Sequence, residues 1–272
     1  MERMETEHAF CKDSLKVMIF SSRSGLGHAA GLDAAEAIKE AVSRKGEANV
    51  MFAAAPSQNE TLAALCADPD IDWSKVNAFH MDEYISLPED NPAGFRYYLR
   101  ERIFGRFSFA SVNLLDGNAA DPEEEAARYS RLLEAHPMDV CLCGIGENGH
   151  LAFNDPPVAD FRDPLKVKIV RLDQVCRMQQ VHDGCFKTID EVPTHALTLT
   201  PPALCRAKRM FCMVPTATKA EAVKKTVLGE IREMVPATIL RMHPDATLYV
   251  DPDSGKYLLE AGFGEEEDVP EG

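Results

Sequence analysis

The 272-residue chain has few positively charged residues, few aromatic residues and no long apolar run. Lys and Arg total 29 against 44 Asp and Glu, which gives a formal net charge of −15 at pH 7. Such an acidic chain repels nucleic-acid backbones and anionic membrane surfaces, so no nucleic-acid or membrane partner is expected. A small phosphorylated ligand in a local basic pocket is not excluded. No segment approaches the ~20 apolar residues that a membrane span needs, and the polar N-terminus lacks the apolar stretch of a secretory signal.

The eight cysteines form no Cys-x-x-Cys pair. Several of them lie in strongly apolar runs, where a cysteine usually serves as a small buried hydrophobic residue. Cys141 and Cys143 are alternate residues of one expected strand, which is poor geometry for a disulfide. We therefore expect reduced thiols, no metal site and a cytoplasmic protein.

Apolar runs alternate with helical patterns along most of the chain. Near-continuous apolar strands separated by helices predict a parallel sheet that is covered on both faces. Strands are expected at 15–20, 49–55, 76–82, 138–146, 166–172, 195–200, 209–215 and 246–251, and helices at 27–44, 58–67, 91–105, 121–136 and 218–228.

With no repeat, linker or break in composition, the pattern predicts an α/β fold with a single doubly wound, mostly parallel sheet. The expected organisation is an N-terminal extension (1–14), one α/β domain (15–258) and an acidic tail (259–272). Ligands of such sheets bind outside the carboxyl ends of the strands, so the loops after the strands are the places to search for a site.

A glycine-rich turn follows the first expected strand. Gly25, Gly27 and Ala30 match the Gly-x-Gly-x-x-Gly/Ala pattern of dinucleotide-binding proteins. Those proteins also need an acidic residue at the end of the second strand, and here that strand ends in Ala53-Ala54-Ala55. The turn is therefore interpreted as a glycine-rich entry to a helix.

The second strand is followed by Ser57, Gln58, Asn59 and Glu60, which have the spacing of a helix capping box. A helix N-terminus at this edge of a sheet also binds anions well. Glu60 counts against an anion because its carboxylate would repel a phosphate. The spacing alone leaves a simple capped helix and an anion site equally open.

Two acidic residues, Asp82 and Glu83, follow the third apolar strand. At that position they point toward the expected cleft, where either could act as a general base. They could equally be loop residues that cap a local backbone group.

The most informative segment is the glycine turn at 144–149, which ends a buried strand and leads directly to His150. Glycines let the backbone approach a ligand closely, and histidine is the side chain best suited to proton transfer near neutral pH. Asp155 follows five residues later, stiffened by Pro156, and could orient the imidazole ring. The combination favours a catalytic over a structural histidine.

Two cations follow later strands. Thr218 and Glu221 have capping-box spacing, which would place Lys219 in a first helical turn. A cation is disfavoured there by the helix dipole unless it meets an anion, so Lys219 is a candidate phosphate ligand. Arg177, beyond the strand at 166–172, is a weaker second candidate.

Four segments together resemble glucosamine-6-phosphate deaminases, which belong with the 6-phosphogluconolactonases in one superfamily. The segments are FHMDEYISLP (79–88), GIGENGHLAFNDPP (144–157), VPTATKA (214–220) and RMHPDATLYVD (241–251). The similarity extends from about residue 15 to 255, and the FNDP continuation after His150 favours the deaminase branch.

The resemblance implies isomerisation of glucosamine 6-phosphate and loss of ammonia to give fructose 6-phosphate, without metal or organic cofactor. Asp82 would move a proton from carbon 2 to carbon 1, and His150 would open the pyranose ring. Asp155 would support His150, and Glu83 would be a second carboxylate in the cleft. Asn148 stands where some members have aspartate; its amide can hydrogen-bond the imidazole but carries no charge.

The phosphate would be bound by Arg177 and Lys219 together with the turn Ser57-Gln58-Asn59. The family usually has a Pro-Thr-Gly-Gly run at this turn, so the sequence 56–60 is a departure. Three alternative functions are compatible with the same resemblance. They are a deaminase or isomerase of another hexosamine phosphate such as galactosamine phosphate, a lactone hydrolase, and a non-catalytic sugar-phosphate sensor. Sensors usually carry an N-terminal helix-turn-helix, for which 1–14 is too short. The resemblance leaves homo-oligomer formation open.

Overall fold

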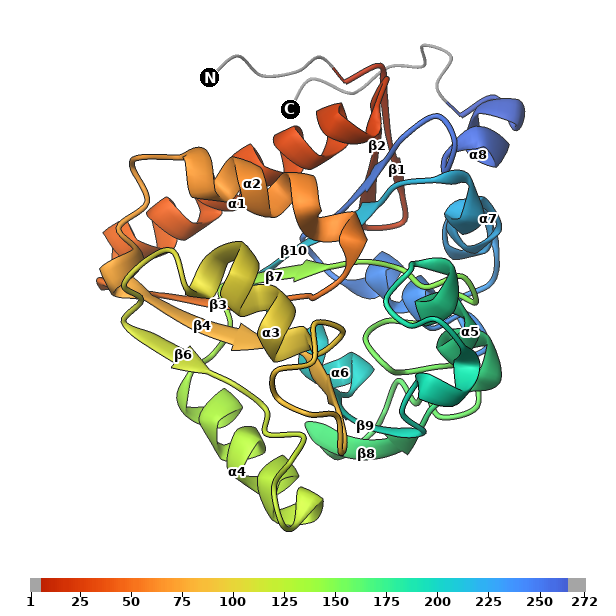
Figure 1. Cartoon of the computed structure of the whole chain (residues 1–272). Helices are drawn as coiled ribbons and strands as arrows, with labels where there is room; N and C mark the ends of the chain where they lie inside the picture. The colour runs from red at the N-terminus through yellow and green to blue at the C-terminus, as the bar shows by residue number, and fades with distance from the viewer. Residues whose placement is uncertain (1–5, 264–272) are drawn as a thin grey trace.

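An eight-stranded sheet forms the centre of the molecule in the computed structural model, which describes residues 6–263 (Figure 1). The strand order is β1-β2-β11-β10-β7-β3-β4-β6, and all neighbours are parallel except β1 and β2. These strands are β1 (His8–Lys12), β2 (Leu15–Ile19), β3 (Ala48–Phe52), β4 (Val76–His80), β6 (Ser111–Asn113), β7 (Val140–Cys143), β10 (Arg209–Val214) and β11 (Ala246–Val250). The α/β class with a mostly parallel central sheet is confirmed.

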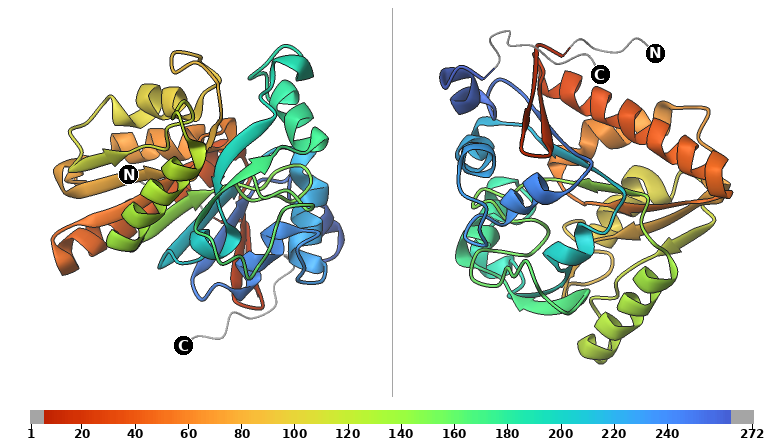
Figure 2. Two further views of the ribbon diagram at one scale, coloured as in Figure 1. Left: turned by 90° about the horizontal axis from the view of Figure 1, so that it is seen from below. Right: turned by 180° about the vertical axis from the view of Figure 1, so that it is seen from behind.

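Helices cover both faces of this sheet (Figure 2). One face carries α1 (Arg23–Lys45), α2 (Asn59–Ala67) and α3 (Phe95–Leu99), and the other carries α4 (Pro122–Ala135), α6 (Pro201–Leu204), α7 (Ala220–Leu228) and α8 (Lys256–Glu260). The other helical segments of the described residues are helix α5 (Gln174–His182), the 3₁₀ turns η1 (Pro56–Gln58), η2 (Trp73–Lys75), η4 (Ile189–Glu191), η5 (Ala217–Lys219) and η6 (Pro236–Met242), and a π-helical turn η3 (Arg100–Phe104).

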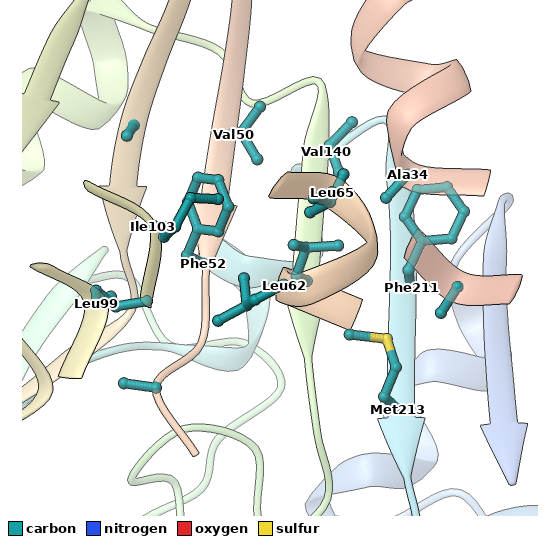
Figure 3. Close-up of a cluster of buried hydrophobic side chains, with 14 of the residues drawn as sticks. Ala34, Val50, Phe52, Leu62, Leu65, Leu99, Ile103, Val140, Phe211 and Met213 are labelled. Carbon is teal, nitrogen blue, oxygen red and sulfur yellow. The ribbon is translucent and has the colours of Figure 1, made fainter. Parts of the chain in front are cut away.

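Alternation along the strands divides the interior into two cores. Val50 and Phe52 of β3 face α2 in the first core, where Leu62 and Leu65 pack (Figure 3), while Met51 between them belongs to the second core on the opposite face. Because both faces of these strands are buried, they consist of continuous apolar runs. These runs made the strands predictable from the sequence.

Two glycines of α1, Gly27 in the predicted glycine-rich turn and Gly31 after it, serve helix packing. A Cβ atom at Gly27 would lie 2.3 Å from the Cβ of Glu60, and one at Gly31 would lie 2.5 Å from the Cβ of Ala64. Ser22 caps α1 by accepting a hydrogen bond from the backbone of Gly25. The interpretation as a glycine-rich helix entry is confirmed, because the glycines allow α1 to approach α2 closely.

A second, three-stranded sheet corrects the expectation of a single sheet. It contains β5 (Asp82–Tyr84), β9 (His195–Leu199) and β8 (Val167–Arg171), and all its pairs are antiparallel. Residues 166–172 and 195–200 are predicted as strands of the parallel sheet, and 76–82 as one strand, so β8, β9 and β5 depart from expectation. Strand β8 is only partly buried, in keeping with an antiparallel strand that exposes one face.

The limits of the domain also differ from expectation. Strand β1 lies within the predicted N-terminal extension (1–14) and adds an edge strand through five register pairs with β2. Its Phe10 packs against Phe263, with ring centroids 5.0 Å apart. Helix α8 continues to Glu260, past the predicted boundary at 258. Most of the predicted acidic tail (259–272) lies outside the described residues. Among residues 6–263, no helix has the length and apolar character of a membrane span.

Candidate active site

A cavity of about 380 Å³ lies at the carboxyl ends of β3, β7 and β10. The chain leaves β3 toward β4 on one side and leaves β7 toward β10 on the other, so the cavity occupies the switch point of the sheet, where such folds bind ligands. Asp82, His150 and Lys219 all border it, although they are far apart in the sequence.

Asp82 stands at the first position of β5, where the antiparallel pairing with β9 fixes its backbone. Its side chain is buried at the cavity wall. Burial raises the pKa of Asp82 well above its ordinary value, and the charge of Glu83 raises it further. A carboxylate with a raised pKa is a stronger base than a solvated one, which suits proton transfer near neutral pH.

Glu83 is not a cavity residue, which corrects its predicted place in the cleft. Its carboxylate accepts hydrogen bonds from the backbone N–H groups of Tyr84 (3.0 Å), Phe95 (3.2 Å) and Arg96 (2.8 Å). The Arg96 guanidinium lies 3.2 Å from the same carboxylate. Successive residues of a strand point to opposite sides, so Asp82 meets the cavity while Glu83 anchors the start of α3.

His150 emerges from a closely packed glycine turn. The backbone N–H of Gly146 donates to the carbonyl of His150 at 3.0 Å, and Gly149 has a φ of 86°, which favours glycine. A Cβ atom at Gly146 would lie 2.1 Å from Cε1 of the imidazole. Glycine at 146 is therefore required for the ring to lie where it does.

Asn148 and Asp155 fix the tautomer of His150. The Asn148 Oδ1 atom lies 2.8 Å from the imidazole Nδ1, and Asp155 Oδ1 lies 3.1 Å from the same nitrogen. The Asn148 amide donates its own N–H to Asp155 at 2.9 Å, so its oxygen faces the histidine. Because both oxygens accept, Nδ1 carries the proton and Nε2 is left for the cavity. Burial favours neutral Asp155, but its hydrogen bond with His150 holds its pKa below the usual value.

Lys219 is a buried cation at the end of η5. Within residues 6–263 its Nζ atom has no hydrogen-bond partner, and burial lowers its pKa. The preceding loop turns at Thr216, whose φ of 82° is rare for a non-glycine residue, and the backbone N–H of Thr216 donates to the Asp251 carboxylate. The predicted Thr218 cap is wrong, since α7 begins without a side-chain cap.

The loop after β3 brings one of its three predicted phosphate ligands to the cavity. Ser57 borders the cavity, while the Gln58 amide donates to the carbonyl of Cys143 at 3.1 Å. The Asn59 Oδ1 atom accepts from the Tyr98 hydroxyl at 2.7 Å. Gln58 and Asn59 thus fix the loop against its neighbours instead of facing the cavity.

The predicted capping box at this loop is also wrong. Glu60 does not reach back to the backbone of Ser57; its carboxylate binds the Arg23 guanidinium at 2.9 and 3.2 Å. This pairing neutralises the acidic group that counted against an anion at this turn.

Arg177, predicted as a phosphate ligand, does not line the cavity. Its guanidinium donates to the carbonyls of Ile189 (2.6 Å) and Val192 (2.8 Å). Both carbonyls belong to the turn around η4, so Arg177 ties α5 to that turn.

Two cavity cations were not identified from the sequence. Arg23 borders the cavity beside Ser57, and Arg102 reaches it from η3 with its guanidinium 5.1 Å from the centre of the Tyr98 ring. Arg23 lies in the loop after β2, and loops at the carboxyl ends of strands are where a site is expected, so its position marks it as a candidate. Arg102 depends on a π-helical turn, which no simple residue pattern predicts.

The fold and the site define an α/β protein in which a carboxylate (Asp82), an imidazole (His150) and a buried ammonium (Lys219) meet at the switch point of the sheet. Residues 21–249 match the family described as glucosamine-6-phosphate isomerases/6-phosphogluconolactonase, and the chain belongs to this family. It is 34% identical over 213 residues to the glucosamine-6-phosphate deaminase of Listeria monocytogenes serotype 4a (strain HCC23), covering 78% of this chain and 89% of that protein. A Bacillus cereus (strain G9842) glucosamine-6-phosphate deaminase is 37% identical over 191 residues, covering 70% of this chain and 71% of that protein.

Solved structures agree with this assignment. A monomeric glucosamine-6-phosphate deaminase superposes with a TM-score of 0.81 at 29% identity, covering 88% of this chain and 98% of that chain. A 6-phosphogluconolactonase from Shewanella baltica OS155 superposes with a TM-score of 0.72 at 17% identity, covering 86% and 97%, and shares the fold. The resemblance inferred from the four sequence segments is confirmed.

Proposed function

We propose that this protein converts glucosamine 6-phosphate and water to fructose 6-phosphate and ammonia. The observation that carries the proposal is the meeting of Asp82, His150 and Lys219 around one cavity. The relatives described as glucosamine-6-phosphate deaminases support it.

Lys219 would bind the phosphate, with Ser57 and the guanidinium group of Arg102, while Arg23 stays paired with Glu60 at the cavity edge. A buried ammonium that has no partner among the described residues gains a charge-assisted hydrogen bond from a phosphate oxygen. This binding energy is remote from the reacting carbons, so it can be used to position them.

His150 would open the sugar ring, because its Nε2 faces the cavity and can move a proton at the ring oxygen. Asp82 would then take the proton from carbon 2 and return it to carbon 1, which converts the amino aldose to a ketimine. Water would add at carbon 2 and ammonia would leave, giving the ketose. One carboxylate can serve both neighbouring carbons if it lies between them.

The test is a coupled ammonia assay with glucosamine 6-phosphate and galactosamine 6-phosphate, beside a hydrolysis assay with 6-phosphogluconolactone. We expect ammonia from glucosamine 6-phosphate, and its loss in Asp82→Asn with an unchanged circular dichroism spectrum. Release from the galacto epimer alone would move the assignment to that sugar. Lactone hydrolysis alone would identify a lactonase, and binding of the sugar phosphates without turnover would identify a sensor.

We also propose a cytoplasmic location, since all eight cysteines are free thiols, as in reducing compartments. The sequence leaves homo-oligomer formation open, and the structural relative is described as monomeric. Light scattering on the purified chain at assay concentration distinguishes the two states.

A further inference from the structure

Two further potential metal ligands, Asp155 and Cys176, lie close to the imidazole of His150. Donor atoms of His150, Asp155 and Cys176 all lie within 4.8 Å of one another, and all three residues are buried. His150 and Asp155 come from the loop after β7, whereas Cys176 comes from α5. The proposed reaction gives no role to the Cys176 thiol, which lies beside the Asp155 carboxylate.

An imidazole nitrogen, a carboxylate oxygen and a thiolate sulfur are the donors that zinc prefers. Tetrahedral zinc with bonds of about 2.0 to 2.3 Å holds its donors roughly 3.3 to 3.8 Å apart, so the three groups need a contraction of only about 1 Å. A divalent cation with one carboxylate and one thiolate is electrically neutral, which limits the cost of burying it. Of the three residues only His150 lines the cavity, so the ion would bind behind the ring, on the Nδ1 side.

We propose that His150, Asp155 and Cys176 form a binding site for a thiophilic divalent cation such as zinc, and that its occupation stops catalysis. Binding would release one proton, from the Cys176 thiol. Coordination by Nδ1 would move the imidazole proton from Nδ1 to Nε2, which reverses the tautomer that Asn148 and Asp155 maintain. The nitrogen facing the cavity would then carry a proton and could no longer accept one.

The site itself can be tested by metal binding, without any enzymatic assay. Titration of the apoprotein with Co²⁺ should give a thiolate-to-cobalt charge-transfer band at one equivalent, which Zn²⁺ displaces. Cys176→Ser keeps a hydrogen-bond donor toward Asp155 and should lose the band. Cys11→Ser changes an exposed thiol and should retain it. The absence of the band, or its survival in Cys176→Ser, overturns the proposal.

The inhibitory consequence rests on the proposed function, so it is measured separately. Zn²⁺ should inhibit ammonia release, whereas Mg²⁺, which prefers oxygen ligands, should not. Each variant is compared with its own metal-free rate. Cys176→Ser should raise the half-inhibitory Zn²⁺ concentration by more than about tenfold, because loss of an outer-shell partner alone costs 10- to 100-fold in affinity. A cobalt band in a protein that is inactive on amino-sugar phosphates would support the metal site and reject the proposed function. Deaminase activity without a cobalt band would support the function and reject the metal site.

Discussion

Asp82 and Glu83 are consecutive residues of β5 with opposite environments: Asp82 borders the cavity, and Glu83 receives three backbone N–H groups and the Arg96 guanidinium. The alternation of a β-strand separates the two carboxylates. One is left for a substrate, while the other is occupied by the protein itself. The two substitutions should therefore have different consequences.

Asp82→Asn should reduce kcat by at least about 10²-fold, the usual contribution of a general base, with no loss of folding stability. Glu83→Gln should lower the free energy of unfolding by about 1 to 3 kcal/mol, because a buried charged acceptor of hydrogen bonds is replaced by a neutral one. Urea unfolding and steady-state kinetics on both variants give the comparison. Equal destabilisation by both substitutions would contradict the division of roles.

The raised pKa of Asp82 has two consequences for pH dependence. The base must be ionised to act, so the acid limb of kcat/KM should lie above 3.8, the ordinary value for aspartate. Removal of the neighbouring charge in Glu83→Gln should move this limb to lower pH. A limb that stays in place in this variant would show that Glu83 does not influence the base.

The same raised pKa affects stability with a defined sign. A group whose pKa is higher in the folded than in the unfolded state favours folding most at low pH, and this advantage is lost as the pH rises through the folded value. Asp82→Asn, which resembles the protonated acid, should therefore raise the melting temperature at pH 7 and leave it unchanged near pH 3. Calorimetry at the two pH values measures the difference.

Gly146→Ala should disable the enzyme by displacing the imidazole. The new Cβ would fall 2.1 Å from the ring of His150, so one of the two must move. A displacement of about 1 Å in a catalytic group can cost 10²-fold in rate. Gly144→Ala is the matched comparison in the same turn: its Cβ would lie 3.2 Å from the Ser57 hydroxyl, a contact that a shift of a few tenths of an ångström relieves without moving the imidazole. Kinetics with a circular dichroism check should show a much smaller loss for the control.

The sequence predicts the parts of this molecule in which burial and local pattern agree. Strands β2, β3, β4, β7, β10 and β11 are buried on both faces and appear as apolar runs, and the glycine turn before His150 is visible as residue type and spacing. The antiparallel sheet of β5, β8 and β9 was misassigned. Strands β8 and β9 have the five-residue length of several parallel strands, and β5 has only three residues directly after β4, so the local pattern does not show which strands pair.

The direction of a side chain was harder to predict than its position. The segments that carry Glu83 and Arg177 lie near the cavity, as predicted. The two side chains point away from it because each binds groups at least 12 residues away in the sequence. The capping box at Ser57 failed for a similar reason: Glu60 found Arg23, a residue 37 positions away. Whether a side chain binds a local or a distant partner depends on the folded structure. The spacing of residues in the sequence does not give this information.

Arg102→Gln should raise KM for the sugar phosphate by about tenfold and leave kcat nearly unchanged. In the proposed complex the exposed Arg102 guanidinium at the cavity would bind the charged end of the substrate, far from the reacting carbons. A charge-assisted hydrogen bond contributes about 1.5 kcal/mol at the lower end, which corresponds to about tenfold in affinity. Arg100→Gln, in the same η3 turn but paired with Glu89, is the control and should leave KM unchanged. A lower kcat with an unchanged KM would assign Arg102 a different role.

Lys219→Met should separate binding from stability. Burial lowers the pKa of Lys219, so its charged form costs folding free energy that grows as the pH falls below the unfolded value of 10.5. An apolar side chain of similar length removes this cost, and the free variant should melt at a higher temperature than the wild type at pH 7. Inorganic phosphate should raise the melting temperature of the wild type by mass action but should have little effect on Lys219→Met. Lys224→Met removes an exposed cation that lies over the Tyr257 ring and should respond to phosphate like the wild type. An equal response to phosphate in all three proteins would mean that the buried ammonium does not bind the anion.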